Sequence, residues 1–279
     1  MPYDFSVIGM EEKLAGRIFT ILVLTEQNSL VTIIAFFLVA YAFTWIFHGL
    51  IILLHLPFRR ITKSAAQVLY VLGLGGPLVA ALLLAYLSYG QVGATDLLNG
   101  ALNWRTGLIW YLFAIAPIGI IYLVNAVVHR PPQKERFALL QKPSKSLLML
   151  VLAQVWVVIA EEFGWRGFAL PHLQRLFGWL GAGLILGILW ASWHLPMFFV
   201  PRSNQYGSSF PQYVYALIVW SFVMTMLYYQ TNGSILLCMI FHAAANLWGS
   251  IINLPKGAER LAGTLHLPVL LIAMALLLV

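Results

Sequence analysis

Long apolar segments recur along most of this chain of 279 residues, and they limit its possible folds more than any other feature. About eight segments can be marked, each roughly 14–26 residues long, compared with the ~20 residues that a helix needs to cross a bilayer. Because an unpaired backbone group is costly in hydrocarbon, they predict an all-α fold, a polytopic membrane helix bundle of about eight transmembrane helices. The segments lie near 30–56, 65–88, 107–128, 147–165, 179–200, 214–230, 233–252 and 266–279.

The composition agrees with a membrane protein. Charged residues make up 9% of the chain and hydrophobic residues 61%, whereas a soluble domain has about 25% charged residues. The net charge of +7 does not indicate nucleic acid, because the basic residues fall in short loops that face lipid headgroups. We therefore expect a multi-pass protein of the cell membrane, in a bacterial plasma membrane, with the lipid bilayer as a partner and no nucleic acid.

The N-terminal region differs from the rest of the chain. Residues 1–29 contain a charged cluster at 11–13 and only a short apolar stretch, so we expect an interfacial segment there. From residue 30 to residue 279 no soluble-looking block interrupts the apolar pattern, which predicts one transmembrane domain. The polar groups suited to chemistry fall within this domain, at 161–166, 190–194 and 242–246.

Two adjacent glutamates, Glu161 and Glu162, end the long apolar run of the fourth segment. A charge in the middle of a membrane helix costs about 2.5–3.5 kcal/mol on insertion scales, so such residues usually have a function or a partner. Glu162 and Arg166 are four residues apart, the favoured spacing for an ion pair on one helix face. Glu161 points about 100° away and lacks this partner. We interpret Glu162 and Arg166 as a structural pair and Glu161 as the reactive group; the alternative is that the cluster anchors the helix at the membrane interface.

Two further apolar segments carry His194 and the pair His242 and Asn246. Each taken alone has an ordinary explanation, a hydrogen-bonded core histidine or a polar contact between helices. Together with Glu161 they are more informative, because a carboxylate and a histidine can deprotonate a water molecule. A second histidine and an amide can stabilise an oxyanion. Alternatively, Glu161, His194 and His242 can hold a divalent metal ion such as zinc, so a metal-dependent mechanism stays open.

These motifs resemble those of the CPBP family, which contains type II CAAX prenyl proteases and bacteriocin-processing or immunity-type membrane proteins. The resemblance implies a core of about eight membrane helices, and so it extends over most of the chain. Its motifs correspond here to Glu161-Glu162-x-x-x-Arg166, His194 in the next helix, and His242-x-x-x-Asn246.

The resemblance implies that Glu161 and His194 activate a water molecule, while His242 and Asn246 stabilise the tetrahedral intermediate. The second motif of the family usually has a phenylalanine four residues before the histidine. This chain has Trp190 there, which keeps an aromatic wall and is a supporting residue.

The sequence therefore predicts an intramembrane endopeptidase, glutamate-dependent or metal-dependent, that cleaves a membrane-associated peptide or protein. One alternative is a non-catalytic membrane scaffold or bacteriocin-immunity-type protein of the same fold. Another is a transporter with Glu161 and Arg166 on the substrate path. Packing alone needs no such combination of residues, and the lack of visible repeats disfavours a transporter. The CAAX name does not identify the substrate.

Overall fold

The computed structural model describes residues 5–55, 62–129, 144–200, 203 and 205–251, and every regular element in these ranges is a helix. The predicted all-α class is therefore confirmed for this part of the chain. In chain order the elements are α1 (Phe5–His55), α2 (Lys63–Gly73), α3 (Gly76–Ala101), α4 (Leu108–His129), α6 (Ser144–Glu162), the π-helix η2 (Phe163–Ala169), α7 (Leu170–Trp193), the 3₁₀-helix η3 (Leu195–Phe199), α8 (Phe210–Gln230) and α9 (Ile235–Ile251).

Among the described residues, 5 helical runs are long and apolar enough to cross a membrane. The predicted count of about eight is not confirmed. These runs support a multi-pass membrane protein, while its bacterial origin stays a prediction. They are Ser29–Leu54, Ser64–Ala101, Leu108–Val128, Leu147–Phe199 and Phe210–Gln230.

The count differs from the prediction mainly because apolar segments are joined by continuous helix. The fourth and fifth predicted segments form one run through α6, η2 and α7, which bends at Gly178, where φ is 65°. The predicted segment at 233–252 forms α9, which has 17 residues and is shorter than the ~20 that a span needs. The last predicted segment, 266–279, lies outside the described residues.

Helix also extends into two stretches that lie outside the predicted spans. The stretch between the segments predicted at 65–88 and 107–128 is helical as far as Ala101, with a bend at Gly90, where φ is 61°. From Phe5 onward the expected interfacial segment is helical and continuous with the first span, as α1. The division of the chain at residue 29 stays a prediction.

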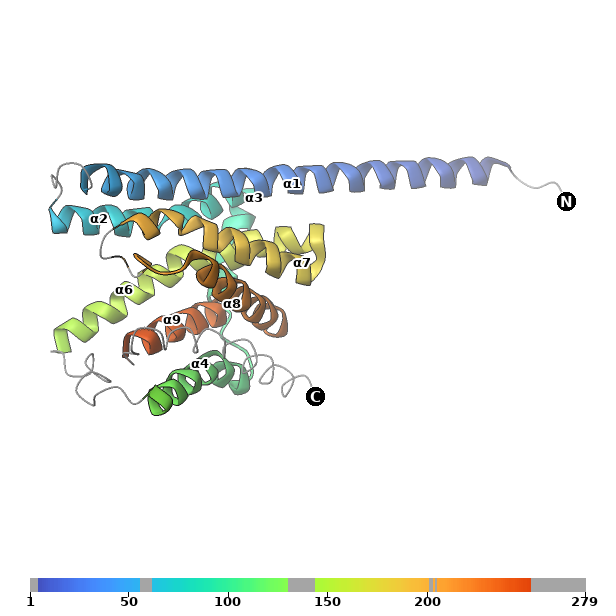
Figure 1. Ribbon diagram of the computed structural model, residues 1–279. Helices are drawn as coiled ribbons and strands as arrows, with labels where there is room; N and C mark the ends of the chain where they lie inside the picture. The colour runs from blue at the N-terminus through green and yellow to red at the C-terminus, as the bar shows by residue number, and fades with distance from the viewer. Residues whose placement is uncertain (1–4, 56–61, 130–143, 201–202, 204, 252–279) are drawn as a thin grey trace.

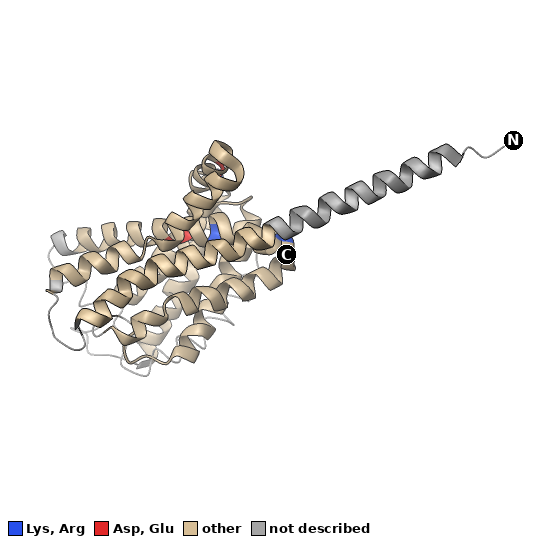
Figure 2. Ribbon diagram, turned by 90° about the horizontal axis from the view of Figure 1, so that it is seen from above, with Lys and Arg blue, Asp and Glu red and all other residues tan. Residues whose placement is uncertain are grey.

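The helices form a bundle in which α6, α7 and α8 lie between two outer groups (Figure 1). One outer group is α1 with α2 and α3, and the other is α4 packed against α9. Figure 2 shows that almost all of the described ribbon carries neither acidic nor basic residues, as a lipid environment requires. The exceptions inside the bundle are therefore informative.

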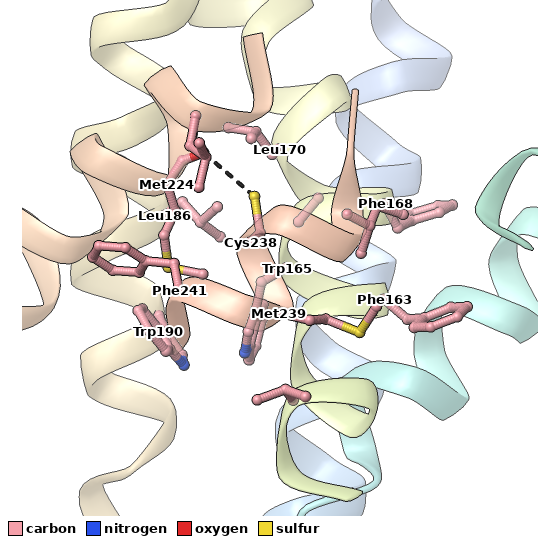
Figure 3. Close-up of a cluster of buried hydrophobic side chains, with 14 of the residues drawn as sticks. Phe163, Trp165, Phe168, Leu170, Leu186, Trp190, Met224, Cys238, Met239 and Phe241 are labelled. Atoms are coloured by element: carbon pink, nitrogen blue, oxygen red, sulfur yellow. Dashed lines mark hydrogen bonds between the residues drawn. The ribbon is translucent and has the colours of Figure 1, made fainter. Parts of the chain in front are cut away.

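The core of the bundle is rich in aromatic side chains. Trp165, Trp190 and Phe241, from η2, α7 and α9, lie in one buried cluster (Figure 3). Cys238 lies in the same cluster, and its thiol donates a hydrogen bond to the main-chain oxygen of Met224 at 3.5 Å. The cluster joins the three elements that carry the sequence motifs.

The π-helix η2 packs closely on the start of α3 at a glycine. A Cβ atom added to Gly164 would lie 2.7 Å from both the carbonyl carbon and the carbonyl oxygen of Pro77. Backbone atoms cannot give way as a flexible side chain does. The absence of a side chain at Gly164 therefore lets η2, and with it the glutamate motif, lie against α3.

We predict that Gly164→Ala destabilises the protein, because overpacking in a core costs about 1–3 kcal/mol. The matched control is Gly49→Ala in α1, where an added Cβ meets nothing within 4 Å. Thermal unfolding in detergent should show a lower midpoint for Gly164→Ala. The control should unfold no earlier than the wild type, because alanine favours a helix more than glycine does. Equal midpoints for the two variants would contradict the close packing.

Candidate active site

The glutamate motif lies where an α-helix changes into a π-helix. Glu162 is the last residue of α6, and η2 starts at Phe163 and contains Arg166. At the end of η2 the Leu170 N–H bonds the oxygen of Trp165, five residues back. π-helical turns are rare and frequently occur at functional sites. Here the wider turn lies within the buried part of the bundle, and the chain stays helical from α6 through η2 into α7.

Glu162 is fully buried and has two partners. Nη1 of Arg166 donates to both carboxylate oxygens, at 3.0 and 2.9 Å, so the ion pair that the spacing predicts is present. Nδ1 of His242, on α9, lies 2.7 Å from Oε1 of the same carboxylate. No pattern in the sequence predicts this second contact. Glu162 therefore joins η2 to α9, and His242 uses its Nδ1–H on a carboxylate.

Glu161 has a different partner. It is 2% exposed, and its Oε2 accepts a hydrogen bond of 2.7 Å from the indole Nε1–H of Trp190 on α7. The two adjacent glutamates thus point to different helices, as their separation around the helix predicts.

Trp190 is in contact with parts of all three motifs. The guanidinium carbon of Arg166 lies 4.3 Å from the centre of the indole ring. The ring of His242 meets it edge-on with centroids 5.3 Å apart, and the ring of His194 lies at 6.2 Å. The structure therefore brings Glu161, His194 and His242 together around one buried tryptophan.

His194 directly follows the end of α7. The predicted helix to residue 200 instead changes to the 3₁₀-helix η3 at Leu195. Nδ1 of His194 lies 2.9 Å from the carbonyl oxygen of Trp190, which can only accept, so Nδ1 carries the proton. Nε2 is then the atom with a free lone pair. The other face of the site is aromatic, since the ring of Tyr213 on α8 lies 5.3 Å from that of His194.

Asn246 lies one turn after His242 on α9 and has its own partner. Its Nδ2 donates to Oε1 of Gln154, on α6, at 3.0 Å. Sequence reasoning missed Gln154. The available signal was a polar residue in an apolar helix, seven residues before Glu161 and thus on nearly the same face. Asn246 therefore lies one helical turn from His242 on α9, and its side chain is hydrogen-bonded to Gln154.

The part of the chain that contains Glu161, His194 and His242 is similar to known proteins. Residues 143–248 match the family model described as type II CAAX prenyl endopeptidase Rce1-like. We call residues 143–248 the Rce1-like region because of this similarity. The match confirms the resemblance that the three motifs predict. Over 108 residues the chain is also 33% identical to CAAX prenyl protease 2 of Methanococcus maripaludis, a match that spans 36% of this chain and 38% of that relative.

The Rce1-like region does not hold Glu161, His194 and His242 as a ready set of metal ligands. Within the described ranges no three His, Cys, Asp or Glu side chains are grouped so that they fit a metal ion. The hydrogen bonds of these residues use Oε2 of Glu161 and Nδ1 of each histidine, which leaves Oε1 and the two Nε2 atoms for other partners. The three side chains would have to move closer together to share a metal ion. Metal dependence stays a question for experiment.

A hollow of about 280 Å³ lies at the α3–α4 loop and the α8–α9 turn, and it is not lined by Glu161, His194 or His242. None of its lining residues belongs to the three motifs, so it is not the candidate site. They are Asn103, Arg105, Thr106, Gly107, Trp110, Gln230, Thr231 and Asn232.

We predict that Arg166→Ala lowers the yield of folded protein. Breaking a buried ion pair by removing one partner costs about 3–5 kcal/mol, because the remaining charge is poorly compensated. The measurement is the fraction of monodisperse protein after purification in detergent.

Arg175→Ala is the matched control, because Arg175 lies on α7 and is exposed; its yield should equal that of the wild type. A normal yield of Arg166→Ala with a selective loss of activity would instead assign Arg166 to the chemistry.

Proposed function

We propose that this chain is an intramembrane endopeptidase that cleaves a membrane-associated peptide or protein, with Glu161 as the base that activates water. The convergence of Glu161, His194 and His242 around Trp190, inside an Rce1-like region, carries this proposal. The name of the relative, CAAX prenyl protease 2, supports a protease. It does not extend to the substrate, so no lipid modification is included in the proposal.

Glu161 and His194 are suited to hold the attacking water. Oε2 of Glu161 is bonded to Trp190, which leaves Oε1 to accept a proton from water. Nε2 of His194 is the second acceptor, because Nδ1–H is bonded to the Trp190 carbonyl. A water between these two acceptors has one O–H directed at each of them, and its lone pair is free to attack a carbonyl carbon.

His242 and Asn246 are suited to stabilise the oxyanion. Because Nδ1–H of His242 bonds Glu162, its Nε2 can donate only when the ring is protonated on both nitrogens. We propose that His242 acts in that form, with its Nδ1–H directed at the carboxylate of Glu162. One N–H of Asn246 bonds Gln154, and the other N–H of the same amide is a second donor for the oxyanion.

The reaction then proceeds in two steps. The water oxygen attacks the peptide carbonyl carbon while Glu161 takes one proton, which gives a tetrahedral oxyanion that faces His242 and Asn246. The C–N bond then breaks as the oxyanion collapses to a carboxyl group. The departing amine receives the proton from Glu161, which restores the base.

We predict that Glu161→Gln abolishes turnover, whereas Asn246→Ala leaves residual activity. Glutamine keeps the shape of the side chain but cannot take a proton. Loss of one oxyanion donor typically costs about 10²–10³ in rate. The assay uses purified protein in liposomes with a library of quenched fluorescent, membrane-anchored peptides.

The matched control for the asparagine is Asn125→Ala, because Asn125 is also a buried asparagine of a membrane helix. Among the described residues, the hydrogen bond of its side chain goes to the Ile121 carbonyl of its own helix. Its turnover should be unchanged. Cleavage by Glu161→Gln at the wild-type rate would refute the role of Glu161 as the base. Absence of any cleavage by the wild type would favour the scaffold hypothesis.

We predict that exhaustive chelation followed by gel filtration leaves the wild-type cleavage rate unchanged. The reason is that the proposed base acts on water directly. Loss of activity on chelation, restored by one added divalent metal, would overturn the mechanism. Glu161, His194 and His242 would then be reassigned around a metal ion.

A further inference from the structure

We infer that Trp190 is a positioning residue that orients both groups proposed to hold the attacking water, an inference that rests on the proposed function. Its side chain donates to the carboxylate of Glu161, and its main-chain carbonyl accepts from Nδ1 of His194. The base and its partner acceptor come from different helices, yet both are bonded to this one residue.

The bond to Glu161 is short and buried. Nε1 of Trp190 lies 2.7 Å from Oε2, the indole is 1% exposed and the glutamate 2%. Hydrogen bonds to a carboxylate are shorter and stronger than bonds between neutral groups, and a low-dielectric surrounding strengthens them further. With Oε2 held in this way, rotation of the carboxylate is restricted and Oε1 is presented in one direction.

The indole itself has little freedom to move. The guanidinium of Arg166 covers one region of the ring at 4.3 Å, and the ring of His242 meets it at 5.3 Å. The ring of Trp220 on α8 lies at 6.5 Å. Since Arg166 and His242 are both bonded to Glu162, the Glu162 network fixes the ring that in turn fixes Glu161. The position of the base is therefore determined by contacts from three helices.

Only the N–H of the indole makes the contact with Glu161. Phenylalanine, the usual residue at this place in the family that the motifs resemble, has an aromatic ring but no donor. Trp190→Phe therefore keeps most of the packing and removes the hydrogen bond. In this chain it leaves a buried carboxylate oxygen without its partner.

The test compares Trp190→Phe with Trp165→Phe, using full-length protein in liposomes and the peptide library. Trp165 is an equally buried tryptophan, but its Nε1 has no hydrogen-bond partner among the described residues. The control therefore loses similar ring volume and no hydrogen bond. We expect kcat to fall about ten- to hundredfold for Trp190→Phe with KM unchanged, because small misplacements of a reacting group cost that much. We expect the control to keep the wild-type kcat.

A second measurement does not depend on activity. In wild-type protein labelled with ¹⁵N at the indole nitrogens, the Trp190 N–H resonance should lie downfield of the other indole signals. Glu161→Gln replaces the charged acceptor by a neutral one, so this resonance should move upfield more than any other indole signal. This measurement does not use Trp190→Phe, so it tests the contact between Trp190 and Glu161 even if that variant does not fold.

The outcomes separate this inference from the proposed function. If Glu161→Gln abolishes turnover but Trp190→Phe and Trp165→Phe have equal kcat, the endopeptidase proposal stands and the role of Trp190 is overturned. An indole resonance of Trp190 that does not respond to Glu161→Gln overturns it as well. Full turnover of Glu161→Gln overturns both, because no base then remains for Trp190 to position.

Discussion

The candidate site depends on the pairing of Glu162 inside an apolar bundle. An unpaired carboxylate buried among membrane helices is costly, and Arg166 and His242 both compensate it. Because these partners lie on η2 and α9, the same contacts set how the first motif lies against the third. Arg166 in turn covers the ring of Trp190, which brings in α7 and the second motif. The ion pair of Glu162 and Arg166, which their spacing on one helix predicts, thus connects all three motifs.

The backbone around the motif serves the same pairing. A π-helix replaces the α-helix from Phe163 to Ala169, and Gly164 within it lets η2 lie against the start of α3. The chain continues through the motif as one helical run, so Glu161, Glu162 and Arg166 stay within the buried layer rather than in a loop at the membrane surface. This burial disagrees with the interpretation of the cluster as an interfacial anchor, which requires contact with headgroups.

Local features of the sequence predict the structure well, and relations between helices do not follow from it. The pair Glu162 and Arg166 follows from their spacing on one helix. The contacts of His242 with Glu162 and of Asn246 with Gln154 depend on how α9 is rotated against α6, which no local pattern encodes. The predicted count of helices is not confirmed for a similar reason. A weakly apolar stretch interrupts the hydropathy signal between two segments, yet the backbone stays helical through it as far as the bend at Gly178.

The two histidines of the site show why such contacts matter for chemistry. His194 donates its Nδ1–H to a neutral carbonyl, whereas His242 directs Nδ1 at a carboxylate. The acceptor behind Nδ1 is therefore neutral for His194 and charged for His242. In the proposed mechanism, Nε2 of His194 accepts a hydrogen bond from water, whereas Nε2 of His242 donates one to the oxyanion. We propose that two identical side chains take these opposite roles because the acceptor behind each ring differs.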